Sequence, residues 1–197
     1  MANQISLKSI AELISQTSPP DGMETRIVAI DGCGGAGKST LATRLAKFLG
    51  DCAVVHTDDF ASMDNSQNWY PRMLEQFLEP VRGNEIAKFQ KYDWNRRQPG
   101  DWITIAPPQR FIILEGVTSS RTEFRPFLSY KIFVQTDRGV RLERGLKRDG
   151  QQALDLWQEW MREEDEYIAR DNPEAVADLI VSGESPTTNA DEVIVLR

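Results

Sequence analysis

Residues 32–39 form the part of this sequence that most directly indicates chemistry. They read Gly-Cys-Gly-Gly-Ala-Gly-Lys-Ser and match the Walker A pattern G-x-x-x-x-G-K-[ST] at every fixed position. Because glycine has no Cβ atom, such a backbone can wrap around an anion and direct its N–H groups at phosphate oxygens. We expect this phosphate loop to bind a nucleoside triphosphate through Gly32, Gly34, Gly35, Ala36, Gly37, Lys38, Ser39 and Thr40.

The residues on either side of the loop support this interpretation. An apolar run, 27–30, precedes it and reads as a buried strand, and residues 40–46 read as the start of a helix. The N-terminus of that helix carries a partial positive charge that attracts anions. In this setting Lys38 is expected to reach the terminal phosphates, and the Ser39 hydroxyl is expected to contact Mg²⁺.

Carboxylates follow two further strand-like runs. Asp58 and Asp59 come after residues 53–57, and Glu115 comes after residues 111–114. The carboxyl ends of parallel strands meet at one edge of a sheet, so these groups are expected near the phosphate loop. There they can hold the water shell of Mg²⁺ or accept the proton of an attacking hydroxyl. One of the two aspartates could instead cap a helix.

A basic helix is expected over residues 138–148. Arg141, Arg144 and Arg148 are spaced i, i+3, i+7 and therefore share one face, with Glu143 as the only acidic residue between them. One reading is an ordinary solvated face. The other is a lid, about residues 138–155, that lays guanidinium groups over the transferring phosphoryl, with Arg144 and Arg148 as catalytic candidates.

Strand-like and helix-like segments alternate along most of the chain. This alternation predicts an α/β fold with a mostly parallel, five-stranded sheet that carries helices on both faces, as three-layer P-loop NTPases have. The expected strands are 26–31, 53–57, 111–116, 129–136 and 177–182, and 193–196 is a weaker one; the expected helices include 38–49, 69–82, 138–148 and 152–170.

One region, about residues 61–106, interrupts this alternation. Residues 87–94 and 102–105 read as extended, and Pro99-Gly100-Asp101 between them reads as a turn. We expect a hairpin that stands off the main sheet. Long insertions in compact domains are often lids or substrate modules, so this excursion is expected to bind substrate rather than to be a plain surface connection. The whole chain, 1–197, is expected to form one domain.

Composition narrows the class of partner and compartment. The net charge is −7 and the pI is near 4.9, so nucleic acid is an unexpected partner. The two cysteines, Cys33 and Cys52, are too few for a disulfide scaffold and indicate a reducing compartment, and Cys33 reads as a small filler of the loop. With no membrane-length apolar run, the protein is expected to be cytoplasmic. His56, the single histidine, is expected to be structural.

Together these residues resemble the P-loop small-metabolite kinases of the uridine kinase, phosphoribulokinase and bacterial pantothenate kinase group. The resemblance runs from about Arg26 to Asp149. It rests on the phosphate loop, on 57–60 (Thr-Asp-Asp-Phe), on 114–116 (Leu-Glu-Gly) and on the basic segment that ends at 148–149 (Arg-Asp).

The resemblance implies roles for several residues. Aligned on Phe60, Asp58 is the general base for the acceptor hydroxyl, and Glu115 assists Mg²⁺. The lid arginines contact phosphates, which supports Arg148 best and Arg144 next. Residues 92–94 (Tyr-Asp-Trp) look like the Tyr-Asp-aromatic element of nucleoside kinases. The acceptor pocket is therefore expected to include Asp58, Tyr92, Asp93, Arg96 and Arg97, and the metal site Ser39, Asp59 and Glu115.

The sequence also departs from the uridine kinase pattern. Gly145 stands where uridine kinases usually have a second, adjacent arginine, and the longer arginine-containing lid that follows in them after the Arg-Asp pair is missing after Asp149. In uridine kinases a histidine follows the Tyr-Asp-aromatic element, and here Asn95 stands in its place. We therefore expect a kinase that uses ATP and Mg²⁺ to phosphorylate a hydroxyl of a small molecule, most readily a nucleoside. Another small acid or a nucleotide is the second candidate acceptor, because Arg96 and Arg97 would suit an anion. A nucleotide-dependent switch or ATPase without an acceptor is the third reading, and a homodimer stays open.

Overall fold

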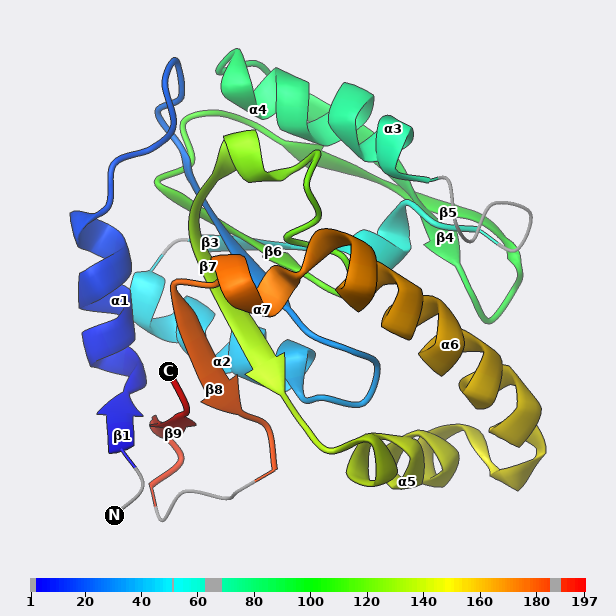
Figure 1. Cartoon of the computed structure of the whole chain (residues 1–197). Helices are drawn as coiled ribbons and strands as arrows, with labels where there is room; N and C mark the ends of the chain where they lie inside the picture. Colours follow the sequence, from blue (N-terminus) through cyan, green and yellow to red (C-terminus); the bar gives the residue numbers. More distant parts are fainter. Residues whose placement is uncertain (1–2, 51, 63–68, 185–188) are drawn as a thin grey trace.

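The computed structural model describes residues 3–50, 52–62, 69–184 and 189–197 (Figure 1). Part of the expected excursion, residues 63–68, lies outside this description. The strands are β1 (Asn3–Ser6), β2 (Arg26–Asp31), β3 (Cys52–His56), β4 (Ala87–Asp93), β5 (Gln98–Ile105), β6 (Phe111–Glu115), β7 (Leu128–Gln135), β8 (Leu179–Ser182) and β9 (Glu192–Val195). The α-helices are α1 (Leu7–Gln16), α2 (Lys38–Leu49), α3 (Tyr70–Met73), α4 (Glu79–Arg82), α5 (Arg138–Asp149), α6 (Leu154–Asp171) and α7 (Pro173–Val176).

Four short helical turns complete the elements. They are the 3₁₀ turns η1 (Thr57–Asp59), η3 (Arg125–Phe127) and η4 (Gln151–Ala153), and the π-helical turn η2 (Leu74–Leu78), which joins α3 to α4. The helix expected over 69–82 is thus a continuous helical segment with a wider turn at its middle.

The central sheet has the strand order β1-β9-β8-β7-β2-β6-β3. Five of these strands, β3, β6, β2, β7 and β8, are mutually parallel, which confirms the expected α/β class. The strands β9 and β1 extend one edge in antiparallel pairing. Because β2 lies between β6 and β7, the loop that follows β2 leaves the sheet near its centre, flanked by the ends of both neighbours.

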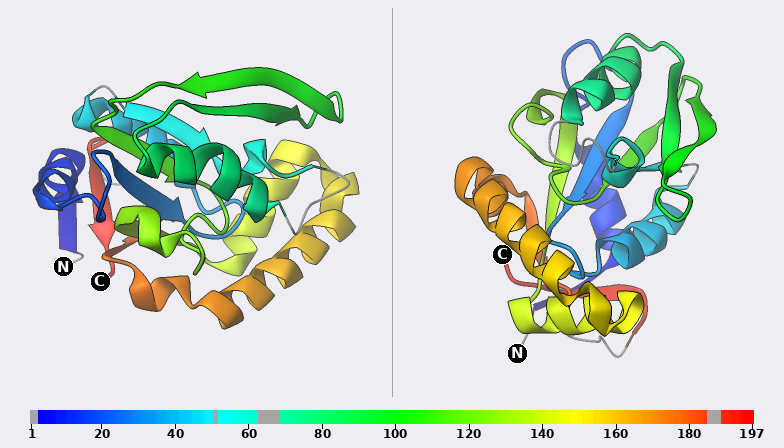
Figure 2. Two further views of the ribbon diagram at one scale, coloured as in Figure 1. Left: turned by 90° about the horizontal axis from the view of Figure 1, so that it is seen from above. Right: turned by 90° about the vertical axis from the view of Figure 1, so that its right-hand side faces the viewer.

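Two apolar cores cover the two faces of the sheet (Figure 2). On one face α1 and α2 pack against side chains such as Val28 and Ile30. On the other face α3, η2, α4 and the base of the β4–β5 hairpin pack against Ile27 and Ala29. Alternate residues of β2 therefore pack into the two cores, which explains why residues 27–30 of this strand are all apolar.

The β4–β5 hairpin forms a second, antiparallel sheet beside the main one. Phe89 is buried against Phe60 and Phe77, whereas Trp94 and Trp102 farther along the hairpin are exposed. The expected excursion from the main sheet is therefore a hairpin anchored at its base. The helices α5 and α6 follow β7 and form a helical hairpin (Figure 1).

Candidate active site

The phosphate loop joins β2 to α2, and its carbonyl groups are held by surrounding side chains. Lys38 Nζ donates to the Cys33 carbonyl at 2.9 Å. Thr136 Oγ1 donates to the Ala36 carbonyl at 3.0 Å, and Arg144 donates to the Gly35 carbonyl at 3.2 Å. The first turn of α2 has N–H groups without acceptors inside the helix. The loop therefore offers backbone donors, together with Lys38, to an anion at the start of α2.

Glycine is required at position 35 for two reasons. The residue has a φ of +75°, which L side chains rarely adopt. A Cβ atom there would also lie 2.6 Å from the Arg141 carbonyl oxygen, because α5 packs directly against the loop. The spacing of glycines in the motif thus reflects both the wrap of the loop and the close approach of a neighbouring helix.

Ser39, Glu115 and His56 form a hydrogen-bonded chain beside the loop. Ser39 Oγ donates to Glu115 Oε1 at 3.1 Å, and His56 Nδ1 lies 2.6 Å from Glu115 Oε2. The parallel register of β3 and β6 sets His56 directly beside Glu115. The hydrogen bond with Glu115 raises the pKa of His56 above its ordinary value, against the effect of burial. Burial alone would raise the pKa of Glu115, but His56 and Lys38 hold it below its ordinary value.

Asp58 faces this cluster from η1, the turn that follows β3. The residue as a whole is exposed, and the charges that act on its carboxyl come from Lys38, Glu115, His56 and Arg148. Burial of the group by the surrounding protein raises the pKa of Asp58, and the charge of Lys38 opposes that rise. The structure thus brings Asp58 to the same place as the Walker A lysine.

Asp59 has different neighbours. Burial raises its pKa, and the charges of His56 and Lys91 lower it. Lys91 belongs to β4, so a charge of the excursion acts on Asp59, whereas the charge of Lys38 in the loop acts on Asp58. The two adjacent aspartates therefore have different charged neighbours. The role of Asp59 in metal binding stays a prediction.

The expected acceptor residues lie at the end of the β4–β5 hairpin. The Trp94 indole N–H donates to the main-chain carbonyl of Asp58 at 3.1 Å, and the rings of Tyr92 and Trp94 meet edge to face at 5.0 Å. Asp93 Oδ1 accepts from the backbone N–H groups of Asn95 and Arg96, so this carboxyl also holds the hairpin turn. Tyr92 and Asp93 are thus near Asp58 by way of Trp94.

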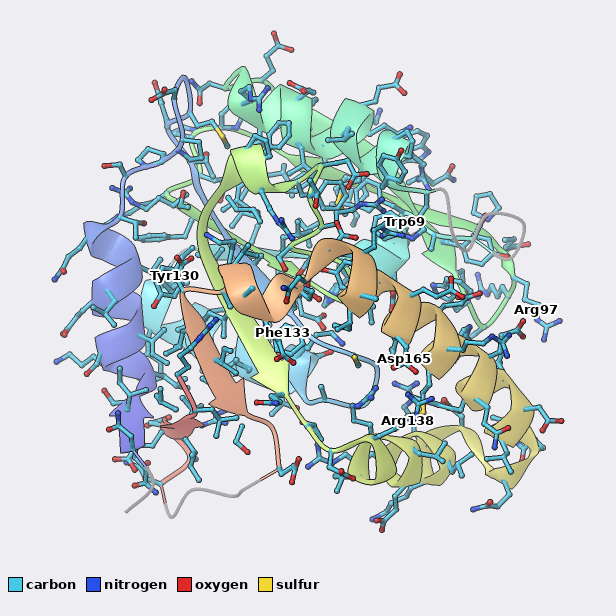
Figure 3. The ribbon with its side chains drawn as sticks, viewed as in Figure 1. Trp69, Arg97, Tyr130, Phe133, Arg138 and Asp165 are labelled. Atoms are coloured by element: carbon cyan, nitrogen blue, oxygen red, sulfur yellow. The ribbon has the colours of Figure 1, made fainter. Side chains whose placement is uncertain are left out.

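Arg96 and Arg97 lie in that turn. The Arg96 side chain is 75% exposed and is 3.7 Å from Asp93. Arg97 has a φ of +53° and is exposed, and in Figure 3 it points away from the body of the molecule. To meet an acceptor, either arginine would have to turn back toward Asp58.

The three arginines of α5 that were expected to share a face have three different environments. Arg148 is exposed, pairs with Asp149 at 2.8 Å and lies 5.5 Å from the Trp157 ring. Arg144 donates to the Gly35 carbonyl, as above, and to that of Gly183 at 2.8 Å, so it braces the loop. Arg141 is buried in an ion pair with Glu164 of α6. The shared face expected for the three is real, but only Arg148 is free to swing toward a phosphoryl group.

Gly145, which replaces the second arginine of the uridine kinase pattern, is explained by packing. A Cβ atom at this position would lie 2.3 Å from the ring of Trp157 on α6. Trp157 is buried, and its indole N–H donates to Asp149 at 2.9 Å. Any side chain at position 145 would therefore have to displace the indole.

Known proteins are similar to this chain in sequence, although no family model matches it. Uridine kinase-like protein 5 of Arabidopsis thaliana is 25% identical over 157 residues, 71% of this chain and 34% of that protein. Inorganic pyrophosphatase TTM2 of Arabidopsis thaliana is 26% identical over 159 residues, 74% of this chain and 23% of that protein. The uridine kinase of Staphylococcus haemolyticus is 25% identical over 142 residues, 64% of this chain and 69% of that protein. The match thus spans about a third of one Arabidopsis protein and about a quarter of the other.

Solved structures share the fold. One is described as a possible uridine kinase from Bacillus stearothermophilus, with a TM-score of 0.66, 19% identity and coverage of 88% of this chain and 96% of that one. A D-glycerate 3-kinase from Cryptococcus neoformans has a TM-score of 0.60, 11% identity and coverage of 96% and 98%. The chain has a uridine kinase-like P-loop kinase fold. The expected resemblance is confirmed, and the expectation of a kinase agrees with these relatives.

The residues of this P-loop kinase fold suit a triphosphate with its magnesium ion. A hydroxyl and one carboxylate, Ser39 and Glu115, are already joined by a hydrogen bond. Mg²⁺ is usually held by one or two protein oxygens together with substrate phosphates, rather than by a complete protein cage. Among the described residues there is no cluster of three or more His, Cys, Asp or Glu side chains that could hold a metal ion.

Two buried acidic residues of this fold were not expected from the sequence. Asp31, the last residue of β2, accepts hydrogen bonds from Gly32 N–H at 2.6 Å and from Tyr167 at 2.6 Å, as well as from Thr118 and Ser120. Glu164 accepts one from Gly34 N–H at 2.5 Å. Two of the loop N–H groups expected to bind phosphate are therefore held by carboxylates. The sequence signals that could have found them are the position of Asp31 directly before the loop, and the helical spacing that sets Glu164 on the face of Met161 and Tyr167.

The thiol of Cys33 within the loop is unreactive in this state. Burial raises the pKa of Cys33 to about 12, and the charge of Glu164 acts in the same direction. Such a thiol stays protonated near neutral pH, so it is a poor nucleophile. This agrees with the expectation that Cys33 fills space in the loop.

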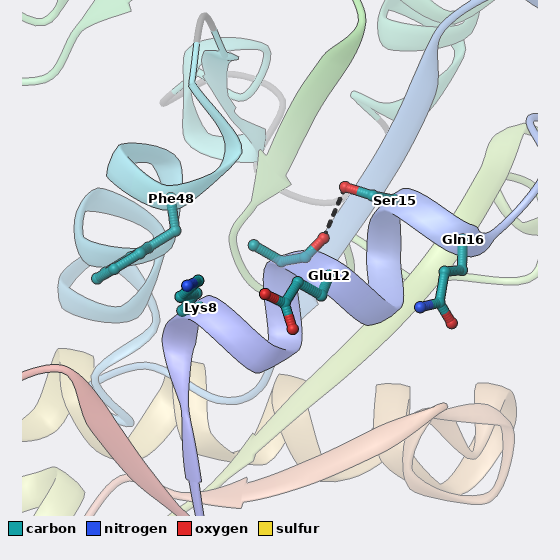
Figure 4. A pocket seen from close by; sticks show the side chains of 6 residues that line it. Lys8, Glu12, Ser15, Gln16 and Phe48 are labelled. Carbon is teal, nitrogen blue, oxygen red and sulfur yellow. Dashed lines mark hydrogen bonds between the residues drawn. The ribbon is translucent and has the colours of Figure 1, made fainter.

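A groove of about 380 Å³ elsewhere on the fold is separate from this site. It lies between α1 and α2 and is lined by Lys8, Ala11, Glu12, Ser15, Gln16 and Phe48 (Figure 4). Phe48 is near the end of α2 opposite to Lys38. Within the described parts of the chain, no helix is both long and apolar enough to cross a bilayer.

Proposed function

We propose that this protein transfers the γ-phosphoryl group of ATP to a hydroxyl group of a small metabolite, with a nucleoside as the leading acceptor class. The observation that carries the proposal is the convergence of Lys38, Ser39, Glu115 and Asp58 at the carboxyl edge of the sheet. The kinases named among its relatives support the same reaction class.

Each residue has a part that follows from its position. Lys38, which donates to the Cys33 carbonyl in the triphosphate-free protein, would exchange that partner for phosphate oxygens. Asp58 would accept the proton of the acceptor hydroxyl as that oxygen attacks phosphorus. Arg148 would neutralise charge on the transferring group from the rim. Ser39 and Glu115 would hold Mg²⁺, which supplies charge neutralisation at the phosphates when bound.

The acceptor side of the proposal rests on the hairpin. Trp94 ties the hairpin to the backbone of Asp58, so an acceptor whose hydroxyl reaches Asp58 also lies near the aromatic pair Tyr92 and Trp94. Flat aromatic surfaces suit a planar base, which favours a nucleoside. An acidic or phosphorylated acceptor would instead require Arg96 and Arg97 to turn inward.

Product analysis tests the proposal. The protein is incubated with Mg²⁺ and ATP, or with GTP, and with a panel of nucleosides, nucleotides and hydroxy acids, and phosphorylated products are identified by mass spectrometry. A phosphorylated nucleoside is the expected product. A phosphorylated acid or nucleotide would show that the acceptor belongs to that class instead. Phosphate release without any phosphorylated acceptor would support a switch, ATPase or phosphatase.

A further inference from the structure

One face of α6 carries a row of buried polar side chains. Glu164, Tyr167 and Asp171 are spaced i, i+3, i+7, and all are less than one tenth exposed. Glu164 accepts from Gly34 N–H, Tyr167 donates to Asp31, and Asp171 accepts from Thr122. One face of this helix therefore contacts the phosphate loop and the residue directly before it.

The contact at Gly34 involves an ion pair. Glu164 Oε1 accepts the Gly34 N–H at 2.5 Å, and Glu164 Oε2 accepts from Arg141 Nη1 at 2.8 Å. Both side chains are only 8% exposed. A lone carboxylate this close to a phosphate site would repel the triphosphate, but the paired guanidinium offsets its charge. The phosphate loop is thus contacted by an ion pair whose two charges offset each other.

The fit around this contact is close. A Cβ atom on Gly34 would lie 3.0 Å from Glu164 Oε1 and 3.2 Å from the Trp157 ring. One residue on, Gly35 meets the backbone of Arg141. The peptide between Cys33 and Gly34 is therefore fixed in orientation by α5 and α6.

We propose that Glu164, held by Arg141, is a positioning residue that fixes the Cys33–Gly34 peptide and so prepares the phosphate loop for a triphosphate. This inference rests on the proposed function in so far as the ligand is a nucleoside triphosphate. Glu164 touches the loop and does not touch substrate, so its effect passes through the orientation of the loop.

The chain offers a matched control for this pair. Arg138 and Asp165 join the same two helices at 2.7 Å, and Figure 3 shows them facing each other between α5 and α6. Their side chains are 51% and 59% exposed, and no contact with the phosphate loop is recorded for these two residues in the described part of the chain. Asp165→Ala removes an ion pair between the same helices without touching the loop.

The first measurement is the affinity for Mg²⁺ and a non-hydrolysable ATP analogue, by calorimetry. Glu164→Ala is expected to weaken binding by about tenfold or more, since a lost charge-assisted hydrogen bond typically has an effect of that size. Glu164→Gln keeps an oxygen for the Gly34 N–H and is expected to retain most of the affinity. Asp165→Ala is expected to bind like the wild type. Thermal unfolding of each variant shows that it is folded.

The second measurement needs no nucleotide. In a Cys52→Ser background, Cys33 is the only thiol, and its rate of reaction with an aromatic disulfide reagent reports how far the loop opens. Glu164→Ala is expected to react severalfold faster than Glu164→Gln and Asp165→Ala. If the wild type bound no triphosphate, the proposed function would fail, and this rate would still decide whether Glu164 holds the loop.

Two results would overturn the inference. Wild-type affinity together with an unchanged Cys33 rate in Glu164→Ala would show that the contact is incidental. Tighter binding of the analogue by Glu164→Ala would show that the carboxylate competes with the phosphates, which is the opposite role.

Discussion

The indole of Trp94 is hydrogen-bonded to the main-chain carbonyl of Asp58, 36 residues earlier in the chain. This contact ties the end of the β4–β5 hairpin to the turn that carries the proposed general base. A displacement of the end of the hairpin would therefore affect the turn that carries Asp58, in addition to the contact of Phe89 with Phe60 at the base of the hairpin.

Trp94→Phe is expected to raise the KM for the acceptor severalfold while the KM for ATP changes little. The substitution keeps an aromatic ring but removes the only hydrogen-bond donor of the indole. Trp102→Phe is the control, because Trp102 is an exposed tryptophan of the same hairpin. Steady-state kinetics with each substrate varied in turn checks this, and equal effects of the two substitutions would contradict it.

Lys38→Ala is expected to abolish turnover and weaken triphosphate binding while the fold is kept. The ammonium group of Lys38 would offset charge on the β- and γ-phosphates, and its bond to the Cys33 carbonyl shows that it already lies within the loop. Activity, affinity for the Mg²⁺–ATP complex and circular dichroism are measured on the same preparation. Undiminished turnover in the folded variant would rule out the phosphate-loop assignment.

Asp58→Asn is expected to lower kcat by roughly 10²–10⁴-fold, the usual contribution of a general base. Asp59→Asn is expected to cost less, because Asp59 is surrounded by charges of His56 and Lys91 and not by Lys38. Both variants are assayed across a Mg²⁺ titration, in which Asp59→Asn alone is expected to alter the metal dependence. The reverse order of the two kcat values would make Asp59 the base.

Arg148→Ala is expected to depress kcat more than it raises the KM for ATP, because its contact would strengthen as charge redistributes in the transition state. Arg138→Ala, on the same helix but paired with Asp165, is expected to be nearly silent. The two variants are compared at saturating acceptor. A matching loss in both would mean that α5 acts as an ordinary solvated helix.

Asp171→Asn is expected to destabilise the fold at pH 7 by about 1–3 kcal/mol, the usual cost of losing a buried charge-assisted hydrogen bond. Burial alone would raise the pKa of Asp171, but hydrogen bonds from Thr122 and Arg170 hold it below its ordinary value. The stabilisation is therefore present above about pH 4 and is lost as the pH falls through the lowered pKa. The free energy of unfolding of the wild type and the variant is measured with denaturant at several pH values from about 2.5 to 7. A difference between the two proteins that does not shrink in acid would contradict the prediction.

The sequence predicted the parts of the site that are local in the chain. The phosphate loop, the strand before it and the helix after it form one continuous segment, 26–49, and the structure has them at these bounds. Asp58 and Glu115 were placed correctly at strand ends, because parallel strands bring their carboxyl ends to one edge. Hydrophobic periodicity and motif spacing are sufficient for features of this kind.

Contacts between segments that are far apart in the chain could not be predicted from periodicity and motif spacing. Glu164 meets Gly34 across 130 residues and Arg141 across 23. Helical spacing places Glu164 on the same face as Met161 and Tyr167, but it does not tell which distant segment that face contacts. The same holds for Trp94 at Asp58, and for the pairing of His56 with Glu115, which depends on the register of two strands. Periodicity tells which residues share a face, but the partner of that face is decided by tertiary packing.

The contact between Gly145 and Trp157 makes two positions depend on each other. The indole fills the space that a side chain at 145 would enter. An arginine at position 145, as in the uridine kinase pattern, would require a small residue at position 157 at the same time. Arginine at 145 alone would collide with the indole, and a small residue at 157 alone would leave a cavity beside Gly145. In homologous sequences these two positions should vary as a pair, so that a tryptophan at position 157 would mark an α5 helix with glycine, rather than arginine, at position 145.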